Sequence, residues 1–363
     1  MPIRSVITAI LLSITAVAAV EGRSARDPAS LSRAGLQAID DQRYGDALDA
    51  FTRAAALKPG DASLCFGAGI AEFMLGQDDV ARARFECALS LDPGYLPAAT
   101  WLGDLHYRAG RLREAIAVYE AARERSPSAR ELDEPIASWR DELALHSRFR
   151  EVRSEHFIGL YESAADEPLA RDALARLEAA QGRVRDALGV GAGDPVTVVL
   201  YTREQFDRIT KLASWSVAGF DGRIRVPLGG AAAAHDDLDR VLSHELVHAI
   251  VARLGGRAVP AWMNEGLATV LEPAGSGDVE AALTRGAVPA DLSQLHGGFA
   301  GLSRRDAEVA YASAARAVRR LLERRGAAAI VSLLQDLGRG APVARAFERR
   351  LAMRYDDFAR DRH

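Results

Sequence analysis

Cysteine is scarce in this chain of 363 residues, and so is any excess of charge of one sign. Cys65 and Cys87 are too few for a disulfide-rich scaffold or for a zinc site built from thiolates. They form either one disulfide or two separate buried thiols, and the second arrangement is favoured. The 46 basic and 50 acidic residues nearly cancel, which leaves a formal net charge of −4 without a run of like charges. The sequence therefore gives no indication of nucleic acid binding.

Long apolar runs are missing everywhere except at the N-terminus. There, Arg4 precedes an uncharged stretch over residues 5–20 that ends in small side chains. This pattern predicts a secretory signal within residues 1–25, with cleavage after Ala19. The alternative is an uncleaved N-terminal anchor, although the stretch is shorter than the roughly 20 residues that a membrane span needs. Both interpretations predict a bacterial protein exported to the periplasm or the cell exterior, with no other membrane contact.

A period of 34 residues runs through the chain from about residue 28 to residue 127. Small residues let two helices approach closely, an aromatic residue fills the space between them, and proline ends the second helix. The pattern closely resembles the tetratricopeptide repeat, and residues 129–150 have the length and apolar spacing of a helix that caps three such repeats. The repeated columns are Gly35, Gly69 and Gly103; Ala47, Ala81 and Ala115; Phe51, Phe85 and Tyr119; Ala54, Ala88 and Ala122; and Pro59, Pro93 and Pro127.

The resemblance implies that one face of the first helix in each repeat lines a concave groove. Phe66, Ile70, Phe73 and Tyr107 would lie on that face. Two interpretations of these side chains stay open. They form a docking groove for a peptide or protein partner, or they pack against the next domain.

The motif H-E-x-x-H, formed by His244, Glu245 and His248, lies in a stretch with helical apolar spacing that Gly255 closes. Residues four apart share one face of a helix, so the two histidines can bind one metal ion while Glu245 stands beside it. With the His and Glu content of this chain, the motif arises by chance in about one such sequence in a hundred. The sequence therefore predicts a metal site.

A catalytic zinc ion takes three protein ligands and keeps one position open. Glu265 follows the motif in a segment that begins with Pro260, where a second helix can return the carboxylate toward the histidines. The segment resembles that of the peptidase MA-like gluzincins, in which Pro-x-Trp-x-x-Glu-Gly-x-Ala follows H-E-x-x-H, and the resemblance covers about residues 151–363. It implies that His244, His248 and Glu265 bind one Zn²⁺ ion and that Glu245 is the general base. The matching residues are Pro260, Trp262, Glu265, Gly266 and Ala268.

The same resemblance implies an α+β, thermolysin-like fold. Residues 154–163 and 195–201 are predicted strands with a helix over about 166–189 between them, and 219–229 resembles the edge strand that receives an extended substrate. Tyr311, ahead of an amphipathic helix, resembles the family's hydrogen-bond donor to the oxyanion, and an ordinary core residue is the alternative. Thr269 departs from the family, because thermolysin-like relatives carry there an acidic residue that supports a ligand histidine. Activity is therefore weaker, or another group takes that role.

The length of the chain and its motifs predict two domains behind the N-terminal segment. These are an all-α tetratricopeptide solenoid over residues 26–150 and a zinc metallopeptidase domain over residues 151–363. We expect an exported enzyme that hydrolyses a peptide or protein substrate and uses its repeats for docking. The alternative is a catalytically inactive tetratricopeptide scaffold of the cell envelope, with a remnant or structural zinc site.

Overall fold

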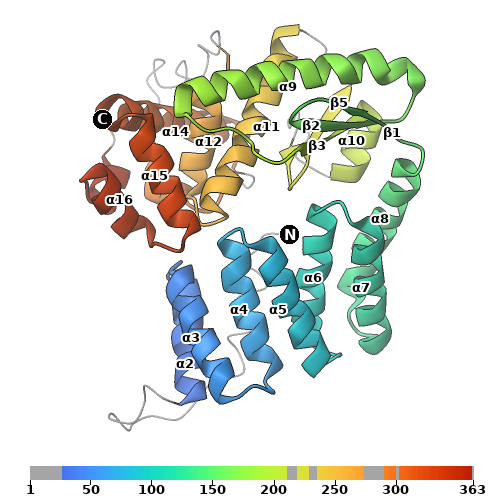
Figure 1. The fold of residues 1–363 in the computed structure, drawn as a ribbon, viewed down its shortest axis with the longest axis vertical. Coiled ribbons are helices and arrows are strands. Elements are labelled where there is room, and N and C mark those ends of the chain that lie inside the picture. Colours follow the sequence, from blue (N-terminus) through green and yellow to red (C-terminus); the bar gives the residue numbers. More distant parts are fainter. Residues whose placement is uncertain (1–26, 211–218, 229–234, 274–289, 300–301, 362–363) are drawn as a thin grey trace.

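The computed structural model describes residues 27–210, 219–228, 235–273, 290–299 and 302–361, and the predicted signal at residues 1–25 lies outside them. The described chain begins as a row of antiparallel helix pairs (Figure 1). The second helix of each pair ends two residues before the proline column, as the repeat predicts. The bounds are α2 (Pro28–Asp40), α3 (Tyr44–Leu57), α4 (Ala62–Met74), α5 (Asp78–Leu91), α6 (Leu96–Arg108) and α7 (Leu112–Arg125).

The glycine and aromatic columns meet inside each helix pair. A Cβ atom on Gly35 would lie 2.8 Å from the ring of Phe51, and Gly103 faces the ring of Tyr119 even more closely. These aromatic rings are buried, so neither glycine position has room for a methyl group. The packing predicted from the repeat is confirmed in the helix pairs.

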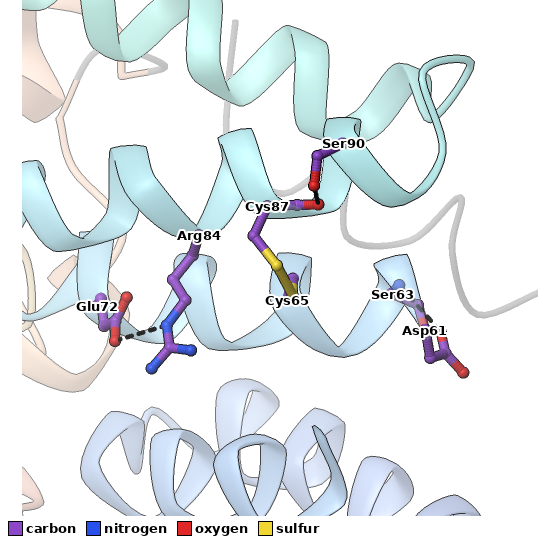
Figure 2. The surroundings of a disulfide bond; sticks show 7 residues. All are labelled: Asp61, Ser63, Cys65, Glu72, Arg84, Cys87 and Ser90. Carbon is purple, nitrogen blue, oxygen red and sulfur yellow. Dashed lines mark hydrogen bonds and ion pairs between the residues drawn. A yellow bond between two sulfur atoms is a disulfide. The ribbon is translucent and has the colours of Figure 1, made fainter. Parts of the chain in front are cut away.

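A disulfide joins Cys65 on α4 to Cys87 on α5 (Figure 2). The Cα atoms of the two residues are 6.1 Å apart, which is within the usual range for such a bond. The expectation of two separate thiols was therefore wrong. The chain folds back between α4 and α5, which brings residues 22 positions apart in the sequence to facing positions on the two helices.

A 3-10 turn (Arg130–Leu132) and α8 (Asp133–His146) follow the repeats, where the sequence predicts a capping helix. Trp139 of α8 shares a core with α7 and stacks on the ring of Tyr107 at 4.9 Å. Leu145, near the other end of α8, belongs instead to a core beneath the following sheet. The capping helix therefore packs on both the repeats and the second part of the chain.

The second part of the chain contains, among the described residues, a five-stranded sheet with the order β1-β2-β3-β5-β4. The central strands β2, β3 and β5 are parallel, whereas β1 and β4 run antiparallel to their neighbours. α9 (Glu167–Leu188) makes the crossover from β2 to β3 that parallel strands require, as predicted. β1 was not predicted. The strands are β1 (Arg150–Arg153), β2 (Phe157–Tyr161), β3 (Val196–Thr202), β4 (Gly219–Phe220) and β5 (Ile224–Leu228).

Both faces of the sheet are covered. Val198 and Leu200 of β3 point into a core that is shared with α9 and α11 (His235–Gly255). Val199 and Tyr201 point to the opposite face, where they pack with α10 (Arg203–Thr210) and with Leu145 of α8. Alternate side chains of a strand point to opposite faces, so β3 links the helix that carries the H-E-x-x-H motif to the capping helix of the repeats.

Residues 219–229 were predicted to form one edge strand, and this prediction was wrong. β4 and β5 pair with each other antiparallel, with a turn between them at residues 221–223. Gly222 in this turn has a φ of 114°, a conformation that other residues rarely adopt. β5 therefore lies inside the sheet, and of the two hairpin strands only β4 is at an edge of the described sheet.

Two of the remaining described helices pack directly against α11, and the other three pack against these two or against one another. No described helix is both long and apolar enough to cross a membrane. The helices are α12 (Ala261–Val270), α14 (Arg304–Arg325), α15 (Ala327–Gly338), α16 (Val343–Leu351) and α17 (Tyr355–Arg360).

Candidate metal centre

The helices α11 and α12 bring the predicted metal ligands together. His244 and His248 lie about one turn apart on α11, so their imidazoles leave the same face of the helix. Glu265 lies on α12, which begins directly after Pro260 and packs against α11. One ligand atom from each of the three residues lies within 4.8 Å of the other two.

The distances from Glu265 to the two histidines match those between ligands of a tetrahedral ion. Glu265 Oε2 is 3.4 Å from His244 Nε2 and 3.5 Å from His248 Nε2. Two atoms that bind one zinc ion at its usual bond lengths and at the tetrahedral angle are about 3.3 Å apart. Glu265 therefore lies at a suitable distance from each histidine for both pairs to share one ion.

The other nitrogen of each imidazole is held by an oxygen acceptor. Glu272 Oε1 lies 2.8 Å from Nδ1 of His244, and Asn264 Oδ1 lies 3.0 Å from Nδ1 of His248. An acceptor at Nδ1 favours the tautomer that carries its proton there, which leaves the lone pair of Nε2 free. Both histidines are thus oriented and protonated as metal ligands require.

Glu272 takes the role that the sequence leaves vacant at Thr269. Thr269 is buried three positions before it on the chain, and Glu272 follows the end of α12, where the turn carries its carboxylate to His244. Neither Glu272 nor Asn264 was predicted as a support for a ligand. Asn264 directly precedes Glu265, and this adjacency is the signal that could have identified it.

Unpaired carboxylate oxygens provide a test of whether a cation fits. Oε2 atoms of Glu245, Glu265 and Glu272 are buried without a hydrogen-bond partner in the described structure. A buried acceptor without a partner costs about 1–3 kcal/mol, so native proteins rarely keep several in one place. A cation between the two Nε2 atoms and Glu265 would satisfy one of these oxygens directly and offset the negative charge of the others.

The charges of the predicted ligands also favour a cation at this site. Burial opposes a positive charge on His244, but the carboxylates of Glu265 and Glu272 outweigh burial and raise the pKa of His244 to about 10. Burial likewise opposes a negative charge on Glu265, yet His248 and His244 hold the pKa of Glu265 well below its usual range. In the absence of an ion, the imidazolium proton occupies the place of the positive charge that these carboxylates require.

Glu245 lies beside the three ligands without being one of them. Burial, opposed by the two histidines, raises the pKa of Glu245 above its ordinary value. A carboxylate with a raised pKa is a better base, and one with an unpaired oxygen can accept a proton. The side chain can therefore exchange a proton with a molecule held at the site.

Tyr311 on α14 also reaches the site. Its ring centroid is 6.3 Å from that of His244, and burial together with Glu265 raises the pKa of Tyr311. The close packing of α14 on α12 places it there, because a Cβ on Gly266 would lie 2.5 Å from the carbonyl oxygen of Ala314. Tyr311 therefore keeps its hydroxyl protonated and available as a donor.

The four side chains assigned to the groove pack inside the molecule. Phe66 and Phe73 are each 5% exposed, and Ile70 is buried in the same core. Phe73 lies under the guanidinium of Arg257, which follows α11, with 3.8 Å between the guanidinium carbon and the ring centroid. Tyr107 stacks on α8 and hydrogen bonds across to the sheet. Phe73 and Tyr107 therefore contact the next part of the chain, as the packing interpretation predicts, whereas Phe66 and Ile70 lie in a core within the repeats.

Comparison with known proteins identifies the repeats. Residues 79–133 match the family described as tetratricopeptide repeat. A curated relative is the small glutamine-rich tetratricopeptide repeat-containing protein 2 of Mycosarcoma maydis, with 28% identity over 117 residues. That similarity covers 32% of this chain and only 33% of the relative. The family match ends before the sheet and the metal centre.

Solved structures give the same kind of similarity. The first tetratricopeptide domain of Spaghetti (RPAP3), bound to the HSP90 peptide SRMEEVD, is 24% identical, with a TM-score of 0.31. The similarity covers 33% of this chain and 98% of that one. MamA is 21% identical, with a TM-score of 0.32, over 34% of this chain and 71% of its own. The Sgt2 tetratricopeptide domain from Aspergillus fumigatus is 19% identical, with a TM-score of 0.32, over 40% of this chain and 99% of its own.

Proposed function

We propose that the protein is a zinc-dependent hydrolase of peptide bonds, of the gluzincin type, whose thermolysin-like region carries the active site and whose repeats dock a partner or substrate. The spacing of the three ligand atoms carries this proposal, because 3.4 Å and 3.5 Å are close to the separation that one tetrahedral ion imposes. Glu245 and Tyr311 add a base and a donor beside that ion. Structural zinc sites have no need of either group.

The residues of the chain divide the work of amide hydrolysis. His244, His248 and Glu265 would hold the ion, and zinc, when bound, would act as a Lewis acid toward the scissile carbonyl and toward water. Glu245 takes the proton from the attacking water and delivers it to the leaving amine. Tyr311 donates its hydroxyl hydrogen to the oxygen that becomes negative as the carbonyl is attacked.

Export from the cytoplasm is part of the proposal. The charged start, the uncharged stretch and the small residues before position 20 support a signal. The disulfide between Cys65 and Cys87 supports it independently, because such bonds persist in oxidising compartments. Cell fractionation with a tagged full-length chain tests it, and recovery of the protein in the cytoplasm with reduced cysteines would contradict it.

Zinc content and turnover together test the enzymatic proposal. The purified mature chain should contain one zinc ion per molecule, as measured by inductively coupled plasma mass spectrometry. It should cut members of a broad peptide library, with the products identified by mass spectrometry. Removal of the ion by a chelator should stop cleavage, and readdition of zinc should restore it. Stoichiometric zinc with no cleavage of any peptide would refute the proposal.

A tetratricopeptide scaffold without catalysis is the second candidate, and the comparisons support it more directly than they support hydrolysis, since the family match lies in the repeats. In this alternative the repeats bind a protein partner and the metal centre contributes only stability. The Spaghetti structure, with its HSP90 peptide, is an example of a similar domain that holds a peptide. Partner capture that is identical for the wild-type chain and the Glu245→Gln variant, combined with absent turnover, would favour the scaffold.

A further inference from the structure

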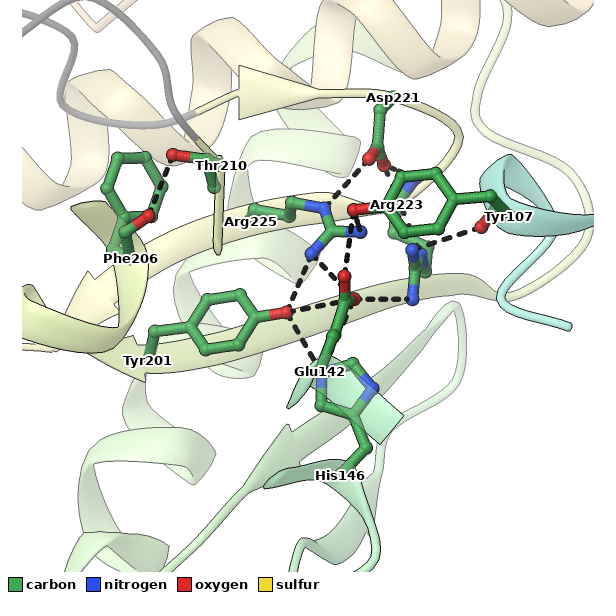
Figure 3. A network of polar contacts seen from close by, with 9 residues as sticks. All are labelled: Tyr107, Glu142, His146, Tyr201, Phe206, Thr210, Asp221, Arg223 and Arg225. Atoms are coloured by element: carbon green, nitrogen blue, oxygen red, sulfur yellow. Dashed lines mark hydrogen bonds and ion pairs between the residues drawn. The ribbon is translucent and has the colours of Figure 1, made fainter. Parts of the chain in front are cut away.

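A buried polar network joins the repeats to the sheet (Figure 3). Glu142 on α8 accepts a hydrogen bond from Arg225 Nη1 of β5 at 2.9 Å and another from the Tyr107 hydroxyl of α6 at 2.8 Å. Arg225 also donates to the hydroxyls of Tyr107 at 3.0 Å and Tyr201 of β3 at 2.7 Å. Glu142 is 1% exposed and Arg225 is 3% exposed, so solvent does not screen these contacts.

The turn between β4 and β5 is held in place by contacts with α6 and with Arg225. Arg223 Nη2 donates to the backbone carbonyl of Tyr107 at 3.1 Å, and Asp221 accepts from Arg225 Nε at 2.8 Å. A Cβ on Gly222 would lie 2.5 Å from the carbonyl oxygen of Arg108, so the turn and the end of α6 are in direct contact. The position of the turn is thus set by the third repeat.

The charges of this network balance. Two carboxylates, Glu142 and Asp221, face two guanidinium groups, Arg223 and Arg225. Apolar side chains of similar volume can attach one domain to another with equal stability, so charge pairing is not needed for attachment. Directional hydrogen bonds do what apolar contacts cannot, because they fix the orientation of the hairpin relative to the repeats.

The same hairpin borders the candidate metal centre. Both β4 and β5 pack against α11, which carries the two histidines and Glu245. β4 is the outermost described strand on this side of the sheet, and an edge strand can pair with an extended peptide through its backbone.

We propose that Glu142 and Tyr107 are positioning residues through which the repeats hold the β4 edge, so that an extended peptide pairs with it while its scissile carbonyl reaches the metal centre. This inference rests on the proposed hydrolase function. In this proposal the third repeat and the capping helix do not touch the substrate. They support the strand that binds it.

Two hydroxamates of different length test the proposal with zinc-loaded full-length protein. Acetohydroxamate can reach only the metal, whereas acetyl-tetra-alanine hydroxamate can also extend along β4. In wild type, calorimetry should show tighter binding of the long compound. Glu142→Gln should weaken the long compound about tenfold or more and leave the short one unchanged. Tyr107→Phe, which removes one hydroxyl, should act in the same direction.

Glu120→Gln is the matched control. Glu120 forms an exposed ion pair with Arg140 of α8 at 2.6 Å, so its loss removes a charge from the repeats without touching the hairpin. Amide hydrogen exchange should quicken at residues 219–225 in the Glu142 variant relative to α9, and should not change in the control. Zinc content should be the same in wild type and in all three variants.

The outcomes separate the two proposals. If neither hydroxamate binds wild type, the hydrolase function fails, and positioning for a substrate fails with it. If both bind but the Glu142 and Tyr107 variants bind the long compound as wild type does, only positioning is overturned. Positioning is also overturned if the variants bind neither compound and amide hydrogen exchange rises throughout the chain, because the two residues would then be merely structural. Where Glu142→Gln does not fold, Tyr107→Phe alone decides.

Discussion

Replacing Glu272 by alanine tests how the metal centre is held without touching a ligand. The carboxylate of Glu272 is buried and accepts from Nδ1 of His244 at 2.8 Å, and Arg240 Nη1 lies 3.8 Å from the same oxygen. In Glu272→Ala, His244 loses both the acceptor that fixes its tautomer and the contact that fixes its ring. The imidazole must then be reoriented each time an ion binds.

The expected loss follows from the position of Glu272. Loss of a group that supports a ligand typically weakens metal binding about 10–100-fold, which corresponds to roughly 1.4–2.7 kcal/mol. Glu272→Gln keeps an oxygen acceptor and loses only the charge, so it should lie between wild type and alanine. Glu265→Ala removes one of the three predicted ligands and should weaken zinc binding more than either substitution of Glu272.

A competition titration against a fluorescent zinc chelator measures these affinities. Thr269→Ala is the matched control, because Thr269 is buried near the same end of α12. Among the described residues it makes no hydrogen bond to His244, His248 or Glu265. Thermal unfolding of the ion-free proteins must show that each variant folds. If Glu272→Ala binds zinc as tightly as wild type while His244→Ala does not bind, the support that we assign to Glu272 is wrong.

Four other substitutions give independent predictions. Glu245→Gln should keep stoichiometric zinc and lower peptide hydrolysis by about 10²–10⁴-fold, and equal turnover would identify a different base. Tyr311→Phe should lower turnover by about 10²–10³-fold at unchanged zinc content, and wild-type turnover would return Tyr311 to the core. Cys87→Ala should lower the free energy of unfolding by about 3 kcal/mol, the value for a loop of this length, as measured by chemical denaturation. Burial, opposed by Glu142, lowers the pKa of His146 from 6.5 to about 4, so its neutral form stabilises the fold above pH 6.5 and that stability is lost as the pH falls toward 4. His146→Gln should remove up to about 3 kcal/mol of this pH dependence, and an unchanged dependence would contradict the assignment.

The parts of the structure that the sequence predicts are those governed by short, regular spacing. Gly35 and Phe51 recur at 34-residue intervals, and each recurrence marks the same close helix contact. His244 and His248 share a helix face for the same geometric reason. Pro260 marks the start of α12 and thereby the return of Glu265. In each case the local periodicity specifies the neighbour.

The parts that the sequence does not predict depend on turns and on distant pairs. Glu272 lies beyond the end of α12, so no helical spacing connects it to His244. Glu142 and Arg225 are separated by 83 positions and carry no pattern that relates one to the other. The hairpin at residues 219–228 was predicted as one strand, although the dipeptide Asp221-Gly222 is a typical turn signal that could have indicated the reversal.

The boundary drawn near residue 150 separates two patterns of sequence, but it does not separate two independent packing units. Arg257, which follows α11, pairs with Asp78 of α5 through both carboxylate oxygens at 2.6 Å and 2.9 Å. Arg225 of β5 pairs with Glu142 of α8 through one carboxylate oxygen at 2.9 Å. Without the repeats, Arg257 would lose its carboxylate partner, whereas Arg225 would keep Asp221 and the hydroxyl of Tyr201. Both pairs fix the sheet and the segment after α11 to the repeats, so the repeats contribute to the present arrangement of these elements. A partner that binds the repeats and shifts α5 or α8 would therefore act on elements that border the candidate metal centre.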